Sequence, residues 1–297
     1  MLKYRLDMLV KKPKHKNFKS RMTLVLTTLI IVGFSACVSY FFLNEQTIQQ
    51  QKQAENARIL ALKAIAATKE AKKKEPVYVT IPGAKPFRAI VEDYAIPGSL
   101  WLVVSKTHPI SVDYVPAGLK IPNVSTRTDK SDAERSVRSD IEQPLINLFS
   151  AASTAGYQLM IGSGYRSAAL QQSYYDSSVN SIGVEATNQA IALPGTSEHQ
   201  TGLAFDVSTV TRTCYLDSCF GTTDDGKWLA DNAYLYGFIL RYPYNKEDIT
   251  GYQYEPWHFR YVGIDLATAL HESGLTLDEA LPYQLKADVT LRQNGAI

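Results

Sequence analysis

Two stretches of the chain place histidine and carboxylate side chains at spacings that suit a metal ion. Residues 197–206 read Ser-x-His-x-x-Gly-x-Ala-x-Asp, so His199 and Asp206 are seven residues apart. Imidazole and carboxylate groups are both good ligands of Zn²⁺. A turn at Gly202 would bring the two side chains to one ion. This spacing alone means little, so the interpretation depends on what else the chain offers.

The second stretch, Glu-Pro-Trp-His-Phe-Arg-Tyr at 255–261, offers a third ligand and a base. His258 could bind the metal while Glu255, three residues earlier, accepts a proton. Pro256 argues against the single helix that carries both groups in an HExxH site, so a loop or a strand start must hold them. Two histidines and one carboxylate leave the fourth position of a tetrahedral zinc open for water, as in catalytic sites.

A third stretch, Gly-Ser-Gly-Tyr-Arg-Ser at 162–167, could supply a positive charge. Arg166 follows a predicted strand in a glycine-rich turn, where its guanidinium could stabilise an oxyanion or hold a carboxylate. On this stretch alone, an ordinary surface arginine is an equally good interpretation. The other histidines, His15, His108 and His271, are interpreted as surface or structural residues.

Together the three stretches resemble the zinc D-alanyl-D-alanine carboxypeptidases of the VanY type. The resemblance covers roughly residues 100–263, and its motifs match in order and in residue type. It implies the compact α+β fold that these peptidases share with hedgehog signalling domains. In this fold a single catalytic domain contains a small antiparallel sheet flanked by helices.

The resemblance also implies roles for individual residues. One zinc ion per chain would be held by His199, Asp206 and His258. Two residues would be catalytic, namely Glu255 as general base and acid and Arg166 as the stabiliser of the tetrahedral intermediate. Three residues would contact substrate, namely Ser197, Tyr165 and Gln171.

The implied reaction is hydrolytic removal of the C-terminal D-amino acid, D-Ala, from peptidoglycan stem peptides. We prefer D,D-cleavage; L,D-cleavage of tetrapeptide stems is the alternative, because L,D-carboxypeptidases carry similar motifs. A wall endopeptidase with the same metal site is a further variant. A different class is a non-catalytic, zinc-containing cell-wall-binding module. Glu255 discriminates against that class, because a module without activity has no need of a base beside an open zinc site.

The elements that must position these residues follow from the pattern of apolar residues. Short strands are predicted at 100–104, 157–161, 204–207 and 257–262, and helices at 132–155, 168–179, 227–236, 266–271 and 277–281. Strands and helices in mixed order indicate an α+β fold. Residues 77–297 are enough to form one domain with a sizeable core.

A separate element precedes this domain. Residues 22–43 carry no charge and would span roughly 33 Å as a helix, enough to cross a bilayer core. We interpret them as an uncleaved transmembrane anchor. A buried core helix, a cleaved signal peptide and lipidation at Cys37 are the alternatives. Residues 44–76 are predicted to form a helical stalk or linker that Pro76 ends, and a solvated spacer fits them equally well.

The charge distribution predicts the orientation of the anchor. Residues 1–21 hold eight Lys or Arg and one acidic residue, so the positive-inside bias places this tail in the cytoplasm. Residues 77–297 are then the extracytoplasmic domain of a single-pass protein of the cell membrane. Residues 76–297 hold 16 basic and 24 acidic residues, which disfavours nucleic acid as a partner. The sequence leaves the oligomeric state open.

Cys214 and Cys219 enclose four residues and could close a small loop by a disulfide in an oxidising exterior. Two free thiols are the alternative. A zinc knuckle is disfavoured, because the chain has three cysteines and no second pair.

Overall fold

The computed structural model describes residues 16–74, 76–90 and 96–295. The chain divides into two compact units, Met1–Glu70 and Ala71–Ile297. Residues 1–15, which hold His15 and most of the basic tail, lie outside the described residues.

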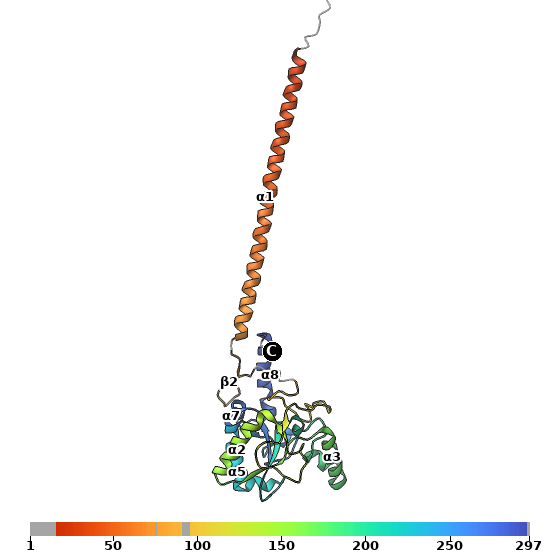
Figure 1. The fold of residues 1–297 in the computed structure, drawn as a ribbon, viewed down its shortest axis with the longest axis vertical. Helices are drawn as coiled ribbons and strands as arrows, with labels where there is room; N and C mark the ends of the chain where they lie inside the picture. The colour runs from red at the N-terminus through yellow and green to blue at the C-terminus, as the bar shows by residue number, and fades with distance from the viewer. Residues whose placement is uncertain (1–15, 75, 91–95, 296–297) are drawn as a thin grey trace, which may run out of the picture. The chain divides into compact units, whose positions relative to one another are not determined.

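One long helix, α1 (Lys16–Lys74), forms the described part of the first unit, and its last four residues belong to the second unit; it is drawn in red and orange in Figure 1. Within the described residues, Arg21–Lys72 is long and apolar enough to cross a membrane, and none of its most apolar window is buried. The helix continues without a break from the apolar segment to Lys74. It ends two residues before Pro76, since a proline ring cannot continue a helix. That residues 44–76 act as a stalk stays a prediction.

The second unit is a mixed α+β domain with small antiparallel sheets, which confirms the predicted fold class. Its central sheet has the order β5-β6-β8-β7, formed by Leu159–Ser163, Ala204–Thr209, His258–Tyr261 and Phe238–Leu240. Two smaller pairs join β1 (Tyr78–Val79) to β2 (Phe87–Arg88) and β3 (Leu119–Lys120) to β4 (Val137–Arg138).

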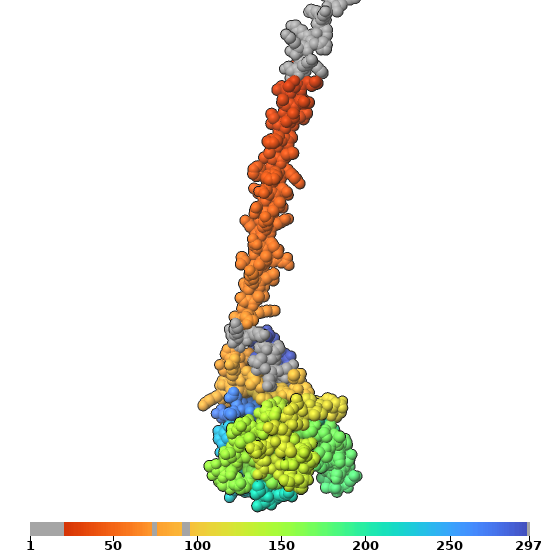
Figure 2. Space-filling model, in the orientation of Figure 1, coloured from red at the N-terminus to blue at the C-terminus, as the bar shows by residue number. Residues whose placement is uncertain are grey.

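Helices flank the central sheet (Figure 1). They are α2 (Glu142–Thr154), α3 (Ala168–Ile182), α4 (Val184–Ala190), α5 (Asp224–Asn232), α6 (Glu247–Thr250), α7 (Ile264–Ser273) and α8 (Leu277–Gln293). Short 3₁₀ turns complete the domain: η1 (Ser139–Ile141), η2 (Glu198–Thr201), η3 (Ser218–Thr222) and η4 (Ala233–Tyr236). In the face shown in Figure 2, the yellow-green surface that includes α2 lies beside the green surface of α3.

The main core lies between α2 and the central sheet. Apolar residues recur on one face of α2 at helical spacing, and all of them are buried: Leu145, Leu148, Phe149 and Ala152. They belong to the same apolar cluster as Phe205 and Val207 of β6. Because side chains alternate along a strand, Asp206 points to the opposite face of the sheet. The core on one face therefore fixes which face carries the candidate site.

The predicted strand at 100–104 is wrong. Residues 100–101 form a turn and residues 102–104 continue as irregular chain, although Trp101, Val103 and Val104 are buried. A short apolar run cannot by itself distinguish a strand from another buried segment. The carbonyls of this segment instead accept hydrogen bonds from Arg260, as described below.

Two predicted helices differ from the structure by about ten residues in their bounds, and the others by a few residues. The helix expected from residue 132 begins at Glu142, because Val137–Arg138 pair with β3. The last helix, expected over 277–281, runs to Gln293. Its start is fixed by a capping box. The side chains of Thr276 and Glu279 each accept a hydrogen bond from the backbone N–H of the other residue.

Candidate functional site

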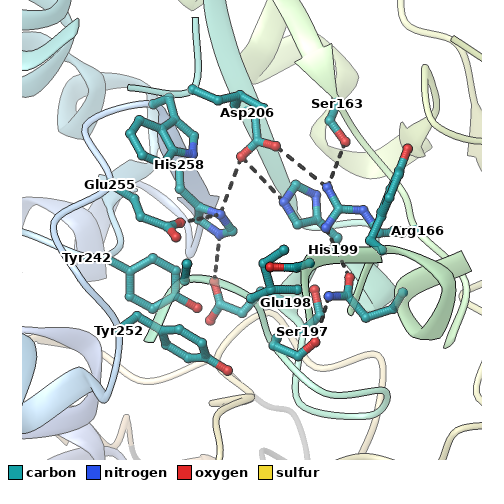
Figure 3. Close-up of a pocket in the computed structure, with 18 of the residues that line it drawn as sticks. Ser163, Arg166, Ser197, Glu198, His199, Asp206, Tyr242, Tyr252, Glu255 and His258 are labelled. Carbon is teal, nitrogen blue, oxygen red and sulfur yellow. Dashed lines mark hydrogen bonds and ion pairs between the residues drawn. The ribbon is translucent and has the colours of Figure 1, made fainter. Parts of the chain in front are cut away.

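Three of the residues singled out in the sequence meet at one point. Asp206 of β6 lies directly across from His258 of β8, because these strands pair with the two residues in register. His199 comes from η2, and Gly202, at φ +69°, ends that turn and leads the chain into β6. One ligand atom from each of the three side chains lies within 4.8 Å of the other two. Figure 3 shows the three side chains converging.

Each histidine turns one ring nitrogen toward this cluster and the other toward an acceptor outside it. His199 Nε2 lies 3.4 Å from Asp206 Oδ1, while its Nδ1 donates to the Gly164 carbonyl at 2.7 Å. His258 Nδ1 lies 3.5 Å from the same Asp206 oxygen, while its Nε2 faces Glu198 Oε2 at 3.6 Å. Outer acceptors of this kind fix the tautomer and orientation of metal-ligating histidines. The two inner nitrogens are thus placed to bind a cation.

The cluster fits a zinc ion. Asp206 Oδ1 is buried and has no hydrogen-bond partner among the described residues, although it faces both histidines. Burial opposes ionisation of Asp206, but His199 and His258 hold the pKa of its carboxyl well below the usual range. It is therefore a carboxylate. Two imidazole nitrogens and one carboxylate oxygen are the three protein ligands of a catalytic zinc with one open position.

Glu255 stands beside the cluster without belonging to it. Its Oε2 lies 3.6 Å from His258 Nδ1, and only 8% of the residue is exposed. Burial raises the pKa of Glu255 to about 7, and the charge of Asp206 contributes in the same direction. A carboxyl with a pKa near neutrality can both accept and return a proton at physiological pH.

Arg166 approaches the cluster from the side opposite Glu255 (Figure 3). Its Nη1 donates to Gln171 Oε1 and its Nη2 to Ser163 Oγ, each at 3.0 Å. The same Nη2 lies 3.8 Å from Asp206 Oδ2. These contacts fix a positive charge beside the cluster.

These side chains line a cavity of about 480 Å³. Of the three predicted substrate contacts, Ser197 and Gln171 line it as well. Tyr165 is buried and is not among the described residues that line the cavity. Two aromatic residues that the sequence analysis did not single out, Tyr242 and Tyr252, form part of the lining, and their rings are 4.9 Å apart.

The sequence analysis also missed a buried ionic group behind His258. Glu198 is fully buried, and its Oε1 accepts hydrogen bonds from Arg241 Nε and Arg260 Nη1, both at 2.8 Å. Burial opposes ionisation of Glu198, but the two guanidiniums hold its pKa well below the usual range. A signal was available, because Glu198 is adjacent to His199 in sequence and Arg260 is two residues after His258.

The two arginines connect this group to the rest of the domain. Arg260 Nη2 donates to the carbonyls of Leu100 and Leu102, both at 2.9 Å. Arg241 donates to both carboxylate oxygens of Asp278, in the first turn of α8. The irregular segment at 100–104 and the start of α8 are thereby tied to the residue that faces His258.

Comparisons with known proteins identify the family. The family model for VanY, D-alanyl-D-alanine carboxypeptidase, matches residues 134–264, which hold every residue of the cluster described above. A putative carboxypeptidase of Bacillus subtilis, YodJ, is 44% identical over 183 residues, 62% of this chain and 67% of that protein. This chain belongs to the VanY family of carboxypeptidases.

Solved structures of VanY-family enzymes agree with this assignment. The structure of the LdcB LD-carboxypeptidase is 44% identical, with a TM-score of 0.58, and the match covers 62% of this chain and 86% of that chain. A vancomycin resistance D,D-pentapeptidase, VanY from a VanB-type cassette, was solved in complex with Zn(II). It is 33% identical, with a TM-score of 0.51, over 61% of this chain and 98% of that chain. A VanY-family member is a hydrolase, so this chain is an enzyme.

We expect the substitution His258→Ala to remove most of the bound zinc. It deletes one of three candidate protein ligands and leaves the carboxylate of Glu198 without the imidazole that it faces. Elemental analysis of the purified full-length protein after dialysis measures the zinc content. The matched control is His271→Ala in α7, where the ring stacks on Tyr234 away from the cluster. Wild-type zinc content in the His258 variant would rule out this ligand assignment.

Proposed function

We propose that this chain is a zinc-dependent carboxypeptidase that removes the C-terminal D-Ala of peptidoglycan stem peptides. The observation that carries the proposal is the placement of Glu255, a buried carboxyl with a raised pKa, beside three candidate zinc ligands at the wall of a cavity. The VanY family assignment supports the same substrate class.

In this proposal the residues of the site have different roles in the reaction. Zinc, held by His199, Asp206 and His258, would supply Lewis-acid activation of water and of the scissile carbonyl. Glu255 accepts the proton of the attacking water at Oε2 and returns it to the leaving amine. Arg166 stabilises the negative charge that develops on the carbonyl oxygen as the water attacks.

A non-catalytic zinc module is a poorer explanation of this geometry. A structural zinc site is closed by four protein ligands, whereas this cluster presents three. Burying a carboxyl such as Glu255 costs free energy, and a module without activity would gain nothing from it. The same arrangement in an enzyme supplies the base.

The position of the cleaved bond has two candidates. The description of the family model, D-alanyl-D-alanine carboxypeptidase, favours D,D-cleavage, which releases the last residue of a pentapeptide stem. The 44% identical structure of an LD-carboxypeptidase favours the second candidate, L,D-cleavage of a tetrapeptide stem. In both reactions the departing residue is D-Ala, so the same catalytic residues serve either one.

The N-terminal helix supports a location at the cell membrane. Residues 22–43 form the anchor, residues 44–76 the stalk, and residues 77–297 the catalytic domain in this proposal. The basic residues before the apolar segment favour a cytoplasmic N-terminus, which places the catalytic domain outside. An enzyme tethered in this way faces the cell wall that holds its substrate.

The test uses full-length protein in detergent, loaded with zinc and incubated with muropeptides that end in penta- or tetrapeptide stems. Mass spectrometry detects the products, and a chelator provides the control. Loss of one D-Ala from the pentapeptide is the expected result, and shortening of only the tetrapeptide would establish the L,D-reaction. If zinc-loaded protein cleaves neither substrate, the carboxypeptidase proposal fails and an endopeptidase or a non-catalytic module takes its place.

A further inference from the structure

A disulfide closes a short loop at one wall of the cavity. The loop, residues 210–219, follows β6 and includes the first two residues of η3, and Cys214 is bonded to Cys219. Tyr215 and Leu216 lie between the two cysteines, and both line the cavity. Neither residue belongs to the metal cluster or to the catalytic groups described above.

The backbone of this loop is held in an unfavourable conformation. Arg212, Cys214 and Leu216 have φ values of 58°, 52° and 51°, in the left-handed region that residues with a Cβ rarely adopt. Three such residues at alternate positions persist only when the surrounding structure constrains them. The disulfide is one such constraint, since it fixes Cys214 to the start of η3.

Contacts from outside the loop hold Tyr215 in place. Its hydroxyl accepts a hydrogen bond from Arg127 Nη1 at 2.6 Å, and that guanidinium lies 4.8 Å from the centre of the ring. A Cβ at Gly162 of β5 would lie 3.0 Å from the ring's Cε2, so the glycine leaves the space that the ring occupies. Asp129 pairs with both Arg127 and Arg212, which ties the beginning of the loop to the same group.

The disulfide and the contacts of Tyr215 place the apolar side chain of Leu216 at the cavity. It is 40% exposed, so a ligand in the cavity can cover it, and Tyr215 precedes it in the same constrained loop. An apolar surface that is already rigid gains contact with a ligand and loses little conformational entropy on binding.

We infer that the loop closed by Cys214 and Cys219 is a substrate-specificity element, which positions Leu216 to contact an aliphatic part of the stem peptide. The inference rests on the proposed carboxypeptidase function. It assigns the disulfide a role in substrate binding, beyond that of a clip that only stabilises the fold. The two roles differ in their kinetic signatures, because lost ground-state contact raises KM without lowering kcat.

The first test is the substitution Leu216→Ala in the full-length, zinc-loaded protein. We expect KM for the cleaved muropeptide to rise roughly tenfold, with kcat within about twofold of wild type and the zinc content unchanged. The matched control is Val210→Ala, at an exposed position of the same loop that is not among the residues described as lining the cavity. A wild-type KM in the Leu216 variant would overturn the inference.

The second test places the disulfide and Leu216 in one double-mutant cycle. The variant Cys214→Ser/Cys219→Ser is expected to raise KM to a similar extent. Adding Leu216→Ala to it should change KM little further, because residues that act through one contact are not additive. If the two effects on KM multiply instead, the disulfide does not act through Leu216. If the cysteine variant fails to fold, Leu216→Ala alone still decides whether the loop contacts the substrate through Leu216.

Failure of this inference and failure of the proposed function have different outcomes. If the wild-type protein cleaves neither stem, the proposed function is wrong. If the wild-type protein cleaves a stem while Leu216→Ala keeps the wild-type KM, the function stands and only the role of the loop is lost.

Discussion

The substitution Glu255→Gln is expected to lower kcat for stem-peptide hydrolysis by about two to four orders of magnitude, the usual contribution of a positioned general acid–base. The amide has the volume of the carboxylate but cannot accept the proton of the attacking water. Bound zinc should stay at the wild-type level, since Glu255 is not one of the three clustered ligands. Elemental analysis and kcat, measured on one preparation, separate loss of the base from loss of the metal.

The pH profile gives this prediction a second measurement. Only the ionised carboxylate can accept a proton, so wild-type kcat/KM falls as Glu255 becomes protonated at acid pH. Burial raises its pKa to about 7 in the metal-free cluster, and the positive charge of zinc lowers that value. The acid limb therefore lies below about pH 7, and it should be absent from the residual activity of Glu255→Gln.

The control for this substitution is the same change at an exposed site. Glu142→Gln in α2 breaks a surface ion pair with Lys120 and touches no residue of the cavity. Its kcat should equal that of the wild type. A Glu255→Gln variant that retains activity within about tenfold of wild type would exclude Glu255 as the base.

The resemblance to the VanY-type peptidases, together with the residue types in the three stretches, was sufficient to predict which residues gather. His199, Asp206 and His258 come together as expected, and the glycine between the first two makes the predicted turn. The pairing that completes the cluster, Asp206 across from His258, depends on the register of β6 and β8. Asp206 and His258 are separated by 51 residues, which leaves that register undetermined at the level of sequence.

The residues that the sequence analysis missed have roles that only the folded chain defines. Glu198, Arg241 and Arg260 are charged. Charged residues are usually exposed, so their residue types alone predict a position at the surface. In the domain they are buried because each compensates the charge of another. The segment at 100–104 was wrongly predicted as a strand for a related reason. Its burial follows from the apolar pattern, but the partner of its carbonyls is the distant Arg260.

The substitution Glu198→Gln is expected to destabilise the domain by about 3–5 kcal/mol, the usual cost of removing one partner from a buried ion pair. The variant leaves the buried guanidiniums of Arg241 and Arg260 without the carboxylate that they share. Asp278 still faces Arg241, but Arg260 keeps only backbone carbonyls as acceptors among the described residues. For a domain of this size the melting temperature should fall by roughly 6–20 °C.

The measurement is thermal unfolding of the full-length protein in a chelator, so that zinc does not contribute to stability. The pKa of Glu198 is depressed in the folded state, so its stabilising effect is present above its unfolded pKa, about 4.5, and is lost only as pH falls toward the folded value. The difference between wild type and variant should therefore be full at neutral pH and shrink in acid. Glu142→Gln again serves as the control, because that exposed ion pair is screened by solvent. Equal melting temperatures for wild type and Glu198→Gln would mean that the two arginines do not depend on this carboxylate. Arg241 and Arg260 would then be held in place by Asp278 and by the backbone carbonyls alone.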